Sequence, residues 1–190
     1  MEGNSKQHLY WNLFVYNQWK MYMAATEDGL CYVGSQNKGF DELAQWAKSR
    51  LPTYVLEQDA HRLQLYTNQF IEYFQGQRTV FTFPLDFYGT PFQVTVWNAL
   101  CNIPYGCTYS YSDIATHIQK PYAVRAVGSA IGANPLLVAI PCHRVIGKNG
   151  KLTGYRGGLR MKEDLLFLEK AKPAVKTGGL DLPSDPKVLI

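Results

Sequence analysis

The sequence has few of the features that mark secreted, membrane-spanning or fibrous proteins. Only four of its 190 residues are cysteine, and their spacing matches no disulfide framework, which favours reduced thiols in a cytosolic or nuclear compartment. No apolar run approaches the roughly 20 residues that a membrane-spanning helix requires. The first residues also lack the basic and then apolar order of a secretory signal. We therefore expect a globular intracellular protein without a membrane partner.

The sequence also lacks the motifs of several common enzyme and metal-binding classes. It has no phosphate-binding glycine loop, no carboxylate pair at a telling spacing and no internal repeat. His8, His61 and Cys31 are single and far apart, so surface histidines and a packed thiol explain them better than a metal site does. We expect no metal site.

Charged residues are unevenly placed along the chain. Residues 1–85 carry 7 Lys or Arg against 8 Asp or Glu, whereas residues 86–172 carry 10 against 5. A basic half favours an anionic partner such as nucleic acid. Many half-domains are basic for solubility alone, so the charge by itself is weak evidence.

The pattern of apolar and turn residues predicts an α+β first half. Residues 19–34 predict a hairpin whose turn ends in Asp28-Gly29. Residues 40–50 predict a short helix that ends before a proline, and residues 55–74 predict a longer helix from apolar residues at mostly helical spacing. Residues 79–83 have the β-branched and aromatic composition of a strand.

The second half is predicted to be mainly helical. Thr90 followed by Pro91 is typical of a helix start. A capping-box pattern predicts a second helix over residues 112–118, and residues 122–131 predict a third. Two short helices joined by a tight turn are typical of a helix-turn-helix. A closing helix is expected over residues 160–170.

Residues 141–145, with the sequence Pro-Cys-His-Arg-Val, are the most informative segment of the chain. An apolar run, residues 136–140, leads into the proline and cysteine, which predicts a buried segment that presents the cysteine at the edge of a pocket. A neighbouring histidine, or a water that it polarises, can favour the reactive thiolate. The adjacency alone is explained better by a core cysteine followed by a capping histidine, because free cysteine is among the most buried residue types.

The predicted helix at residues 122–131 has an unusual composition. Between Ala123 and Ala130, Arg125 is the one long polar side chain among small residues. One interpretation is a helix pressed against the DNA minor groove, with Arg125 reaching into the base stack or groove. The other is a close helix–helix contact with Arg125 in a salt bridge. The residues alone favour neither.

Several blocks of residues follow one another in a specific order and spacing. They are Gly89-Thr90-Pro91-Phe92-Gln93 with Val96-Trp97, Ile103-Pro104-Tyr105-Gly106, Tyr109-Ser110-Tyr111, Ala123-Val124-Arg125-Ala126-Val127-Gly128, Asn134-Pro135, Pro141 to Gly147, Gly154-Tyr155 with Gly157-Gly158-Leu159, and Lys162, Leu165-Leu166 and Glu169. Together they resemble the O6-alkylguanine-DNA alkyltransferases, or methylated-DNA–protein-cysteine methyltransferases. The first half resembles the family only loosely.

The resemblance implies a fold and a domain division. The fold would be α+β, with a ribonuclease-H-like α/β domain at residues 1–85 and a mainly helical domain with a helix-turn-helix at residues 86–172. Residues 173–190 would form a flexible tail.

The resemblance also implies direct DNA repair. The protein would bind double-stranded DNA through the minor groove, flip an alkylated guanine into a pocket, and move the alkyl group from O6 to its own cysteine. It would act once per lesion, without a cofactor, on O6-alkylguanine and O4-alkylthymine. It would be a monomer, with clustering on DNA left open.

Roles for four catalytic residues follow from the same resemblance. Cys142 would be the nucleophile and alkyl acceptor, and His143 would take its proton through a bound water. Glu169 would orient His143, as in a hydrolytic triad. Tyr111 would donate a proton to the departing base. A lowering of the thiol pKa by about three units would make the thiolate dominant.

Further residues are implied to bind DNA or line the pocket. Arg125 would fill the stack vacated by the flipped base, Asn134 would act as a hinge, and backbone carbonyls of Cys142 and Val145 would contact the guanine amino group. Two departures from the family pattern are Arg156, expected to contact a phosphate or narrow the pocket, and Gln119, in a turn where glycine is commoner. The implied DNA-binding residues are Tyr111, Ala123, Arg125, Ala126, Gly128 and Ser129, and the implied pocket residues are Ile131, Val145, Tyr155, Arg156 and Gly157.

Three other functions fit parts of the sequence. An alkyltransferase-like module would bind lesions without repairing them, but such relatives lack the nucleophilic cysteine that this chain keeps. A cysteine hydrolase would leave the helix-turn-helix unexplained. A transcriptional regulator would be expected to carry a second DNA-binding module.

Overall fold

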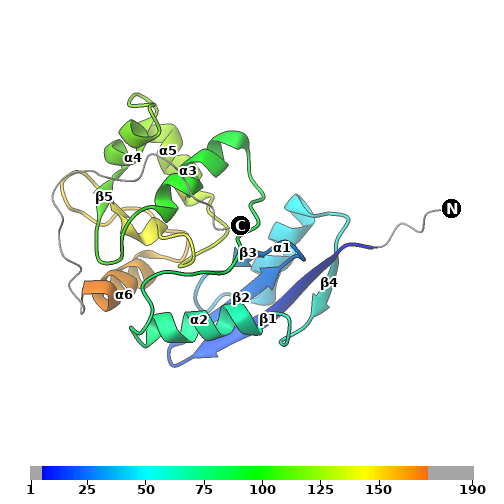
Figure 1. The fold of residues 1–190 in the computed structure, drawn as a ribbon. Coiled ribbons are helices and arrows are strands. Elements are labelled where there is room, and N and C mark those ends of the chain that lie inside the picture. Colours follow the sequence, from blue (N-terminus) through cyan, green and yellow to red (C-terminus); the bar gives the residue numbers. More distant parts are fainter. Residues whose placement is uncertain (1–5, 171–190) are drawn as a thin grey trace.

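The computed structural model describes residues 6–170 as a small sheet with helices on both faces, joined to a group of helices (Figure 1). The sheet has the strand order β3-β2-β1-β4. Strand β1 (His8–Tyr16) pairs antiparallel with β2 (Trp19–Ala25), and β2 pairs antiparallel with β3 (Leu30–Val33). Strand β4 (Val55–Gln58) pairs parallel with β1 at the other edge. The predicted hairpin is therefore confirmed.

Alternation of apolar side chains along β2 gives the sheet two buried faces. Met21 and Met23 point to the face covered by α2 (Gln64–Phe74), where they share a core with Phe70. Ala24 lies on the opposite face, in a second core with α1 (Phe40–Arg50). Successive side chains of a strand point to opposite faces, so one strand serves both cores.

The helix predicted over residues 55–74 is wrong in its first part. Val55–Gln58 is the edge strand β4, and α2 begins only at Gln64. Val55 and Leu56 form the ladder with His8 and Leu9 of β1. A short apolar run cannot distinguish a strand from a helix, and the available edge of β1 decided this case.

The strand predicted at residues 79–83 does not form. Thr82 instead exchanges two hydrogen bonds with the side-chain amide of Gln69, both 2.9 Å long. The rings of Phe81 and Phe83 pack on Phe70 with centroids 4.9 and 6.2 Å apart. The aromatic residues that suggested a strand therefore cover α2 from an irregular segment.

The second half is mainly helical, as predicted. Its helices are α3 (Pro91–Cys101), α4 (Tyr111–His117), α5 (Val124–Gly132) and α6 (Leu159–Lys170), with the 3-10 turn η1 (Cys142–Arg144) between α5 and α6. Two short strands, β5 (Tyr109–Ser110) and β6 (Val145–Ile146), pair in parallel.

Side-chain caps fix the starts of two of these helices. The Thr90 side chain accepts a hydrogen bond from the Gln93 amide, and the Ser110 side chain accepts one from the Asp113 amide. Both form complete capping boxes, which satisfy backbone donors that the helix leaves unpaired. Helix α4 therefore begins one residue earlier than predicted, whereas α5 begins two residues later.

The two halves share one core and a backbone contact. Val33 at the end of β3 donates to the Pro135 carbonyl at 2.9 Å, and Leu137 donates to the Val33 carbonyl at 3.3 Å. Buried side chains of the sheet and α2 continue into those of α3 and the segment 136–140. The boundary at residues 85 and 86 remains a proposal, and the predicted tail at residues 173–190 lies outside the described residues. No helix within residues 6–170 is long and apolar enough to cross a membrane.

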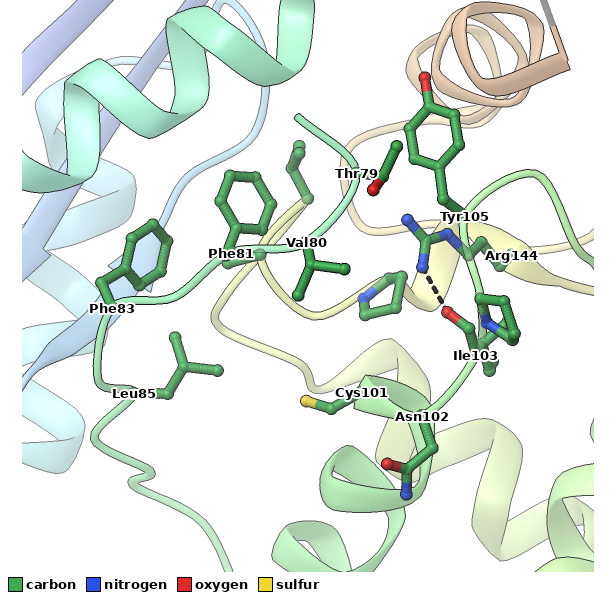
Figure 2. Close-up of a pocket in the computed structure, with 14 residues that line it drawn as sticks. Thr79, Val80, Phe81, Phe83, Leu85, Cys101, Asn102, Ile103, Tyr105 and Arg144 are labelled. Carbon is green, nitrogen blue, oxygen red and sulfur yellow. Dashed lines mark hydrogen bonds between the residues drawn. The ribbon is translucent and has the colours of Figure 1, made fainter. Parts of the chain in front are cut away.

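A cavity of about 260 Å³ lies between the two halves (Figure 2). Phe81 and Phe83 line it on one side, and the end of α3 with Ile103 lines it on the other. The segment that leads into η1 contributes Pro141. None of the implied lesion-pocket residues lines it.

Candidate active site

The segment that leads into η1 is buried and sharply turned. Residues 134–145 are all buried. Val138 has a left-handed backbone, with φ at 70°, and the Ala139 amide donates to the Leu137 carbonyl at 2.8 Å across it. A β-branched residue rarely adopts this conformation, so the tight turn is strained. The turn brings the chain back on itself directly before Cys142.

Cys142 lies at the start of η1 and is only 2% exposed. The side-chain amide of Asn134 donates to its sulfur at 3.0 Å, while the Asn134 Oδ1 atom accepts from the Leu136 amide at 2.9 Å. Asn134 is fully buried and follows α5. One side chain therefore links the end of α5 to the sulfur, in keeping with the hinge implied for Asn134.

The environment of Cys142 favours the protonated thiol over the thiolate that the resemblance implied. Burial raises the pKa of the Cys142 thiol, and the Asn134 hydrogen bond and the charges of Arg156 and Lys162 oppose the effect only in part. Desolvation disfavours the charged form of any group. The thiol therefore keeps its proton at neutral pH until something else in the site changes.

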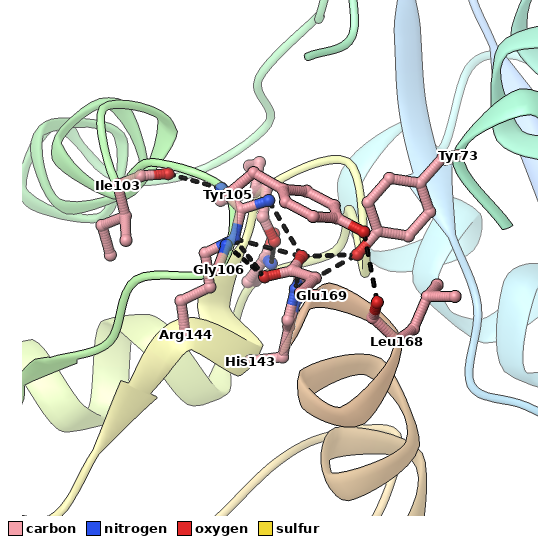
Figure 3. Close-up of polar contacts among 10 residues, drawn as sticks. Tyr73, Ile103, Tyr105, Gly106, His143, Arg144, Leu168 and Glu169 are labelled. Atoms are coloured by element: carbon pink, nitrogen blue, oxygen red, sulfur yellow. Dashed lines mark hydrogen bonds and ion pairs between the residues drawn. The ribbon is translucent and has the colours of Figure 1, made fainter. Parts of the chain in front are cut away.

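The Glu169 carboxylate gathers four donor residues from three parts of the fold (Figure 3). Its Oε1 atom accepts from His143 Nε2 at 2.7 Å and from the Tyr73 hydroxyl at 2.6 Å. Arg144 donates to both carboxylate oxygens at 2.9 Å, and the Gly106 amide donates to Oε2 at 3.2 Å. A buried charge requires such partners, and here they are a guanidinium, an imidazole, a phenol and an amide.

These contacts define the protonation states of the pair. The hydrogen bond from His143, together with the hydrogen bonds and charge of Arg144, holds the pKa of Glu169 well below its usual range, although burial opposes this effect. Burial lowers the pKa of His143, so the imidazole is neutral at pH 7. Since its Nε2 donates to Glu169, its Nδ1 is the basic nitrogen. This atom is buried and makes no hydrogen bond with any other described residue.

Lys162 was part of the family pattern but had no role assigned from the sequence. Its side chain is fully buried in α6, and its Nζ donates to the carbonyls of Val145, Thr153 and Gly154. No ion pair of Lys162 occurs in the described part of the chain. Burial lowers its pKa to about 8. Lys162 thus ties the loop 147–158 to β6 and places a positive charge near Cys142.

The helix-turn-helix consists of α4 and α5. Val127 and Ala130 of α5 face the core, whereas Arg125, Ala126 and Ser129 are exposed. Within residues 6–170, Arg125 forms no ion pair, so the salt bridge of the alternative interpretation is absent. The outer face of α5 therefore offers small side chains and one free arginine.

The turn between α4 and α5 places Gln119 in a backbone conformation that favours glycine. Gln119 has φ at 59°, the left-handed conformation that glycine adopts without strain. The Lys120 amide closes the turn by donating to the Ala115 carbonyl at 2.8 Å. The unusual residue is accommodated at a cost in strain.

Tyr111 begins α4 and contacts the loop that follows β6. Its hydroxyl donates to the Thr153 carbonyl at 3.2 Å, and the Thr153 hydroxyl lies 3.3 Å from it. The ring of Tyr111 lies beside Gly128, where an added Cβ would be about 3.8 Å from it. Tyr111, the implied proton donor, is therefore hydrogen-bonded to the loop in the DNA-free protein. Two other implied DNA-binding residues, Ala123 and Gly128, are only partly exposed.

The implied pocket residues come from α5, β6 and the loop before α6. Ile131 and Val145 are buried in the core. The Val145 carbonyl, expected to contact guanine, accepts from Lys162, which leaves it one lone pair. Burial raises the pKa of Tyr155 well above its ordinary value. Gly157 has no room for a side chain, since a Cβ would lie 2.8 Å from the Tyr155 ring.

Arg156 lies at the junction of the two halves, and its two expected roles stay predictions. Its guanidinium donates to the carbonyls of Val33, Asn134 and Pro135 at 2.6 to 3.1 Å and pairs with Glu42 at 3.2 Å. These partners lie at the junction of the two halves. The side chain therefore holds the loop against the sheet.

Comparisons with known proteins place this arrangement in one family. Residues 9–87 match the model described as "6-O-methylguanine DNA methyltransferase, ribonuclease-like domain", and residues 91–171 match "6-O-methylguanine DNA methyltransferase, DNA binding domain". The inducible methylated-DNA–protein-cysteine methyltransferase of Bacillus subtilis (strain 168) is 57% identical over 170 residues, which cover 90% of this chain and 94% of the relative. The chain belongs to the methylated-DNA–protein-cysteine methyltransferase family. The resemblance seen in the sequence is confirmed.

Solved structures of this methyltransferase family have the same architecture. The Mycobacterium tuberculosis OGT in complex with DNA superimposes with a TM-score of 0.74 at 38% identity, covering 85% of this chain and 93% of that one. The O6-methylguanine-DNA methyltransferase from Pyrococcus kodakaraensis strain KOD1, at 23% identity and a TM-score of 0.66, supports the fold alone. The predicted α+β class, with a helical second domain, is confirmed.

Proposed function

We propose that this protein repairs DNA by transferring the alkyl group of O6-alkylguanine, and of O4-alkylthymine, to Cys142 in a single turnover. One observation carries the proposal: a buried thiol, held by the Asn134 amide, directly precedes a neutral histidine oriented by Glu169. The match to methylated-DNA–protein-cysteine methyltransferases supports the same reaction. The non-repairing alternative is not favoured, because the chain keeps the cysteine.

The chemistry is a displacement at the alkyl carbon. The Cys142 sulfur forms a bond to this carbon as the bond from carbon to the guanine O6 breaks. The thiol proton passes to His143 Nδ1 through a water molecule, and Glu169 stabilises the resulting imidazolium. The departing guanine takes a proton from Tyr111, whose hydroxyl first leaves the Thr153 carbonyl. The thioether product has no hydrolytic exit, so each molecule acts once.

Binding of the lesion uses the outer face of α5. Small side chains there allow the helix to approach the minor groove of double-stranded DNA, and Arg125 enters the stack in place of the flipped nucleotide. The flipped base then lies beside the buried Cys142 thiol, whose pKa is raised by burial. Because the thiol reacts only when its proton can leave, random alkylation of resting protein is slow. The protein acts as a monomer.

Label transfer tests the reaction. Protein is incubated with duplex DNA that carries radiolabelled methyl on guanine O6, and label on protein is counted. About one methyl per protein is expected, none with Cys142→Ser, and an unchanged amount with the control Cys101→Ser, since Cys101 is an exposed cysteine elsewhere. Tight binding without label would favour the non-repairing module, and catalytic turnover would favour a hydrolase.

Substitution of Arg125 tests the flipping step. Arg125→Ala should slow transfer from duplex DNA by about 30-fold, because a filler residue offsets part of the few kcal/mol that flipping costs. Reaction with free O6-benzylguanine, which needs no flipping, should change less than about threefold. Arg160→Ala, which removes a highly exposed arginine of α6, is the control. Equal losses with both substrates would contradict the role of Arg125.

A further inference from the structure

The first half of the chain supplies one hydrogen bond to the catalytic carboxylate. Tyr73 lies near the end of α2 and is 1% exposed. Its hydroxyl donates to Glu169 Oε1 at 2.6 Å and lies 3.5 Å from His143 Nε2 (Figure 3). The other donors to Glu169 belong to the second half, so Tyr73 is the contribution of the ribonuclease-like half among the described residues.

The position of the Tyr73 hydroxyl is fixed by packing. Its ring meets Tyr105 edge-on with centroids 5.9 Å apart, and Phe74 and Phe81 lie 5.4 Å away. A ring enclosed on several sides cannot turn its hydroxyl away from Glu169 without disturbing the core. Packing at the junction between the halves therefore holds this hydrogen bond in place.

We propose that Tyr73 is a positioning residue for alkyl transfer, whose hydroxyl fixes Glu169 Oε1 and thereby sets how strongly His143 holds a proton. This proposal rests on the proposed function, in which neutral His143 accepts the thiol proton. Tyr73 contacts no substrate and acts only through Glu169.

The direction of the effect follows from charge. Burial and the Glu169 charge raise the pKa of Tyr73 well above its ordinary value, so it is always a donor. Removing this donor leaves Glu169 more basic and raises the pKa of His143. The other groups facing the pair are Arg144 and Lys162, which lower the pKa of His143. Tyr105 faces Glu169 as a neutral phenol.

Tyr73→Phe tests the proposal, because it removes one hydroxyl and keeps the ring. With 15N-labelled histidine, an NMR titration reports the pKa of His143 directly, and a His143→Gln spectrum assigns its signals. We expect the midpoint to rise by about half a unit, since Arg144 still holds the carboxylate. The acid limb of the alkyl-transfer profile with methylated duplex DNA should move upward by the same amount.

Tyr66→Phe is the matched control. Tyr66 is a buried tyrosine two turns earlier on α2, and its ring packs on Phe83 rather than near the carboxylate. It should leave both the titration and the profile unchanged. Site-specific 3-fluorotyrosine in place of Tyr73 makes a more acidic phenol and a stronger donor, so the His143 midpoint should fall. This second protein keeps the test decisive if the Phe variant does not fold.

The outcomes separate a positioning role from a structural one. A lower melting temperature with an unmoved His143 titration in both altered proteins would overturn the proposal, because a packing residue affects stability alone. Shifts of opposite sign in the two proteins would establish it. If the unaltered protein transferred no alkyl group, the proposed function would fail, whereas the titration would still decide the role of Tyr73.

Discussion

Lys162 and Glu169 lie two turns apart on the apolar stripe of α6, and both are fully buried. A charged residue among Leu165 and Leu166 at helical spacing is costly unless its partners compensate. Glu169 has a guanidinium, whereas the partners of Lys162 between residues 6 and 170 are backbone carbonyls alone. The two residues therefore use their charges differently: Glu169 binds the His143 imidazole, and Lys162 holds the loop 147–158.

The lowered pKa of Lys162 gives a stability prediction. Its folded pKa is about 8, below the ordinary value of about 10.4. The unfolded chain therefore binds more protons between these values, so the unfolding free energy should rise with pH there, by at most about 1.4 kcal/mol per unit. Lys162→Met should lose this rise. Urea unfolding from pH 7 to 10 measures it, with Cys142→Ser in both proteins so that the thiol does not titrate.

A constant difference between the two proteins across this pH range would contradict the prediction. Below pH 8 the lysine is charged in both the folded and unfolded chains, so the difference should be flat there.

Some site residues could be predicted from the sequence, and others could not. The pair formed by His143 and Glu169 was expected from the family pattern, and the structure brings the two side chains together. Lys162 could have been found, because a lysine on an apolar helical stripe is a signal in itself. Tyr73 could not, since nothing in a tyrosine of α2 shows that it reaches a carboxylate 96 residues away.

At the scale of helices and strands, the sequence predicted a helix start to within one residue where a capping box marks that start. The capping boxes at Thr90 and Ser110 fixed the starts of α3 and α4. Prediction failed at β4 and at residues 79–83, where partners from distant parts of the chain decided the outcome. A strand at a sheet edge depends on a neighbour that its own residues do not reveal.

The turn of the helix-turn-helix gives a prediction for one such element. Gln119→Gly should stabilise the protein by about 1 kcal/mol, because a side chain in the left-handed region costs roughly 1–2 kcal/mol and glycine returns part of this as chain entropy. Denaturant unfolding at neutral pH measures the change. Gln119→Ala keeps the Cβ and should show no such gain; equal gains for both would mean that the backbone is not strained.

At the scale of the whole molecule, the site depends on the junction of the halves. Tyr73 and Glu42 of the first half reach Glu169 and Arg156 of the second, and the buried core continues across the boundary. The resemblance implied two domains, at residues 1–85 and 86–172. The contacts between them could not be foreseen, since they join residues that no local pattern connects.

The burial of the Cys142 thiol explains how the resting protein stays unreactive although it reacts once, irreversibly, with a lesion. Cys142 keeps its proton in the resting protein because it is enclosed, and in the proposed mechanism the neutral His143 accepts that proton. The alkyl group then has one sulfur to reach, although the chain contains three other cysteines.

The adduct itself is the most direct test of this account. Protein treated with a duplex that carries O6-methylguanine is digested and its peptides are identified by mass spectrometry. One added methyl group on Cys142, with Cys31, Cys101 and Cys107 unmodified, is the predicted result. A methyl group on another residue, or unmodified protein after the lesion has disappeared from the DNA, would contradict the account.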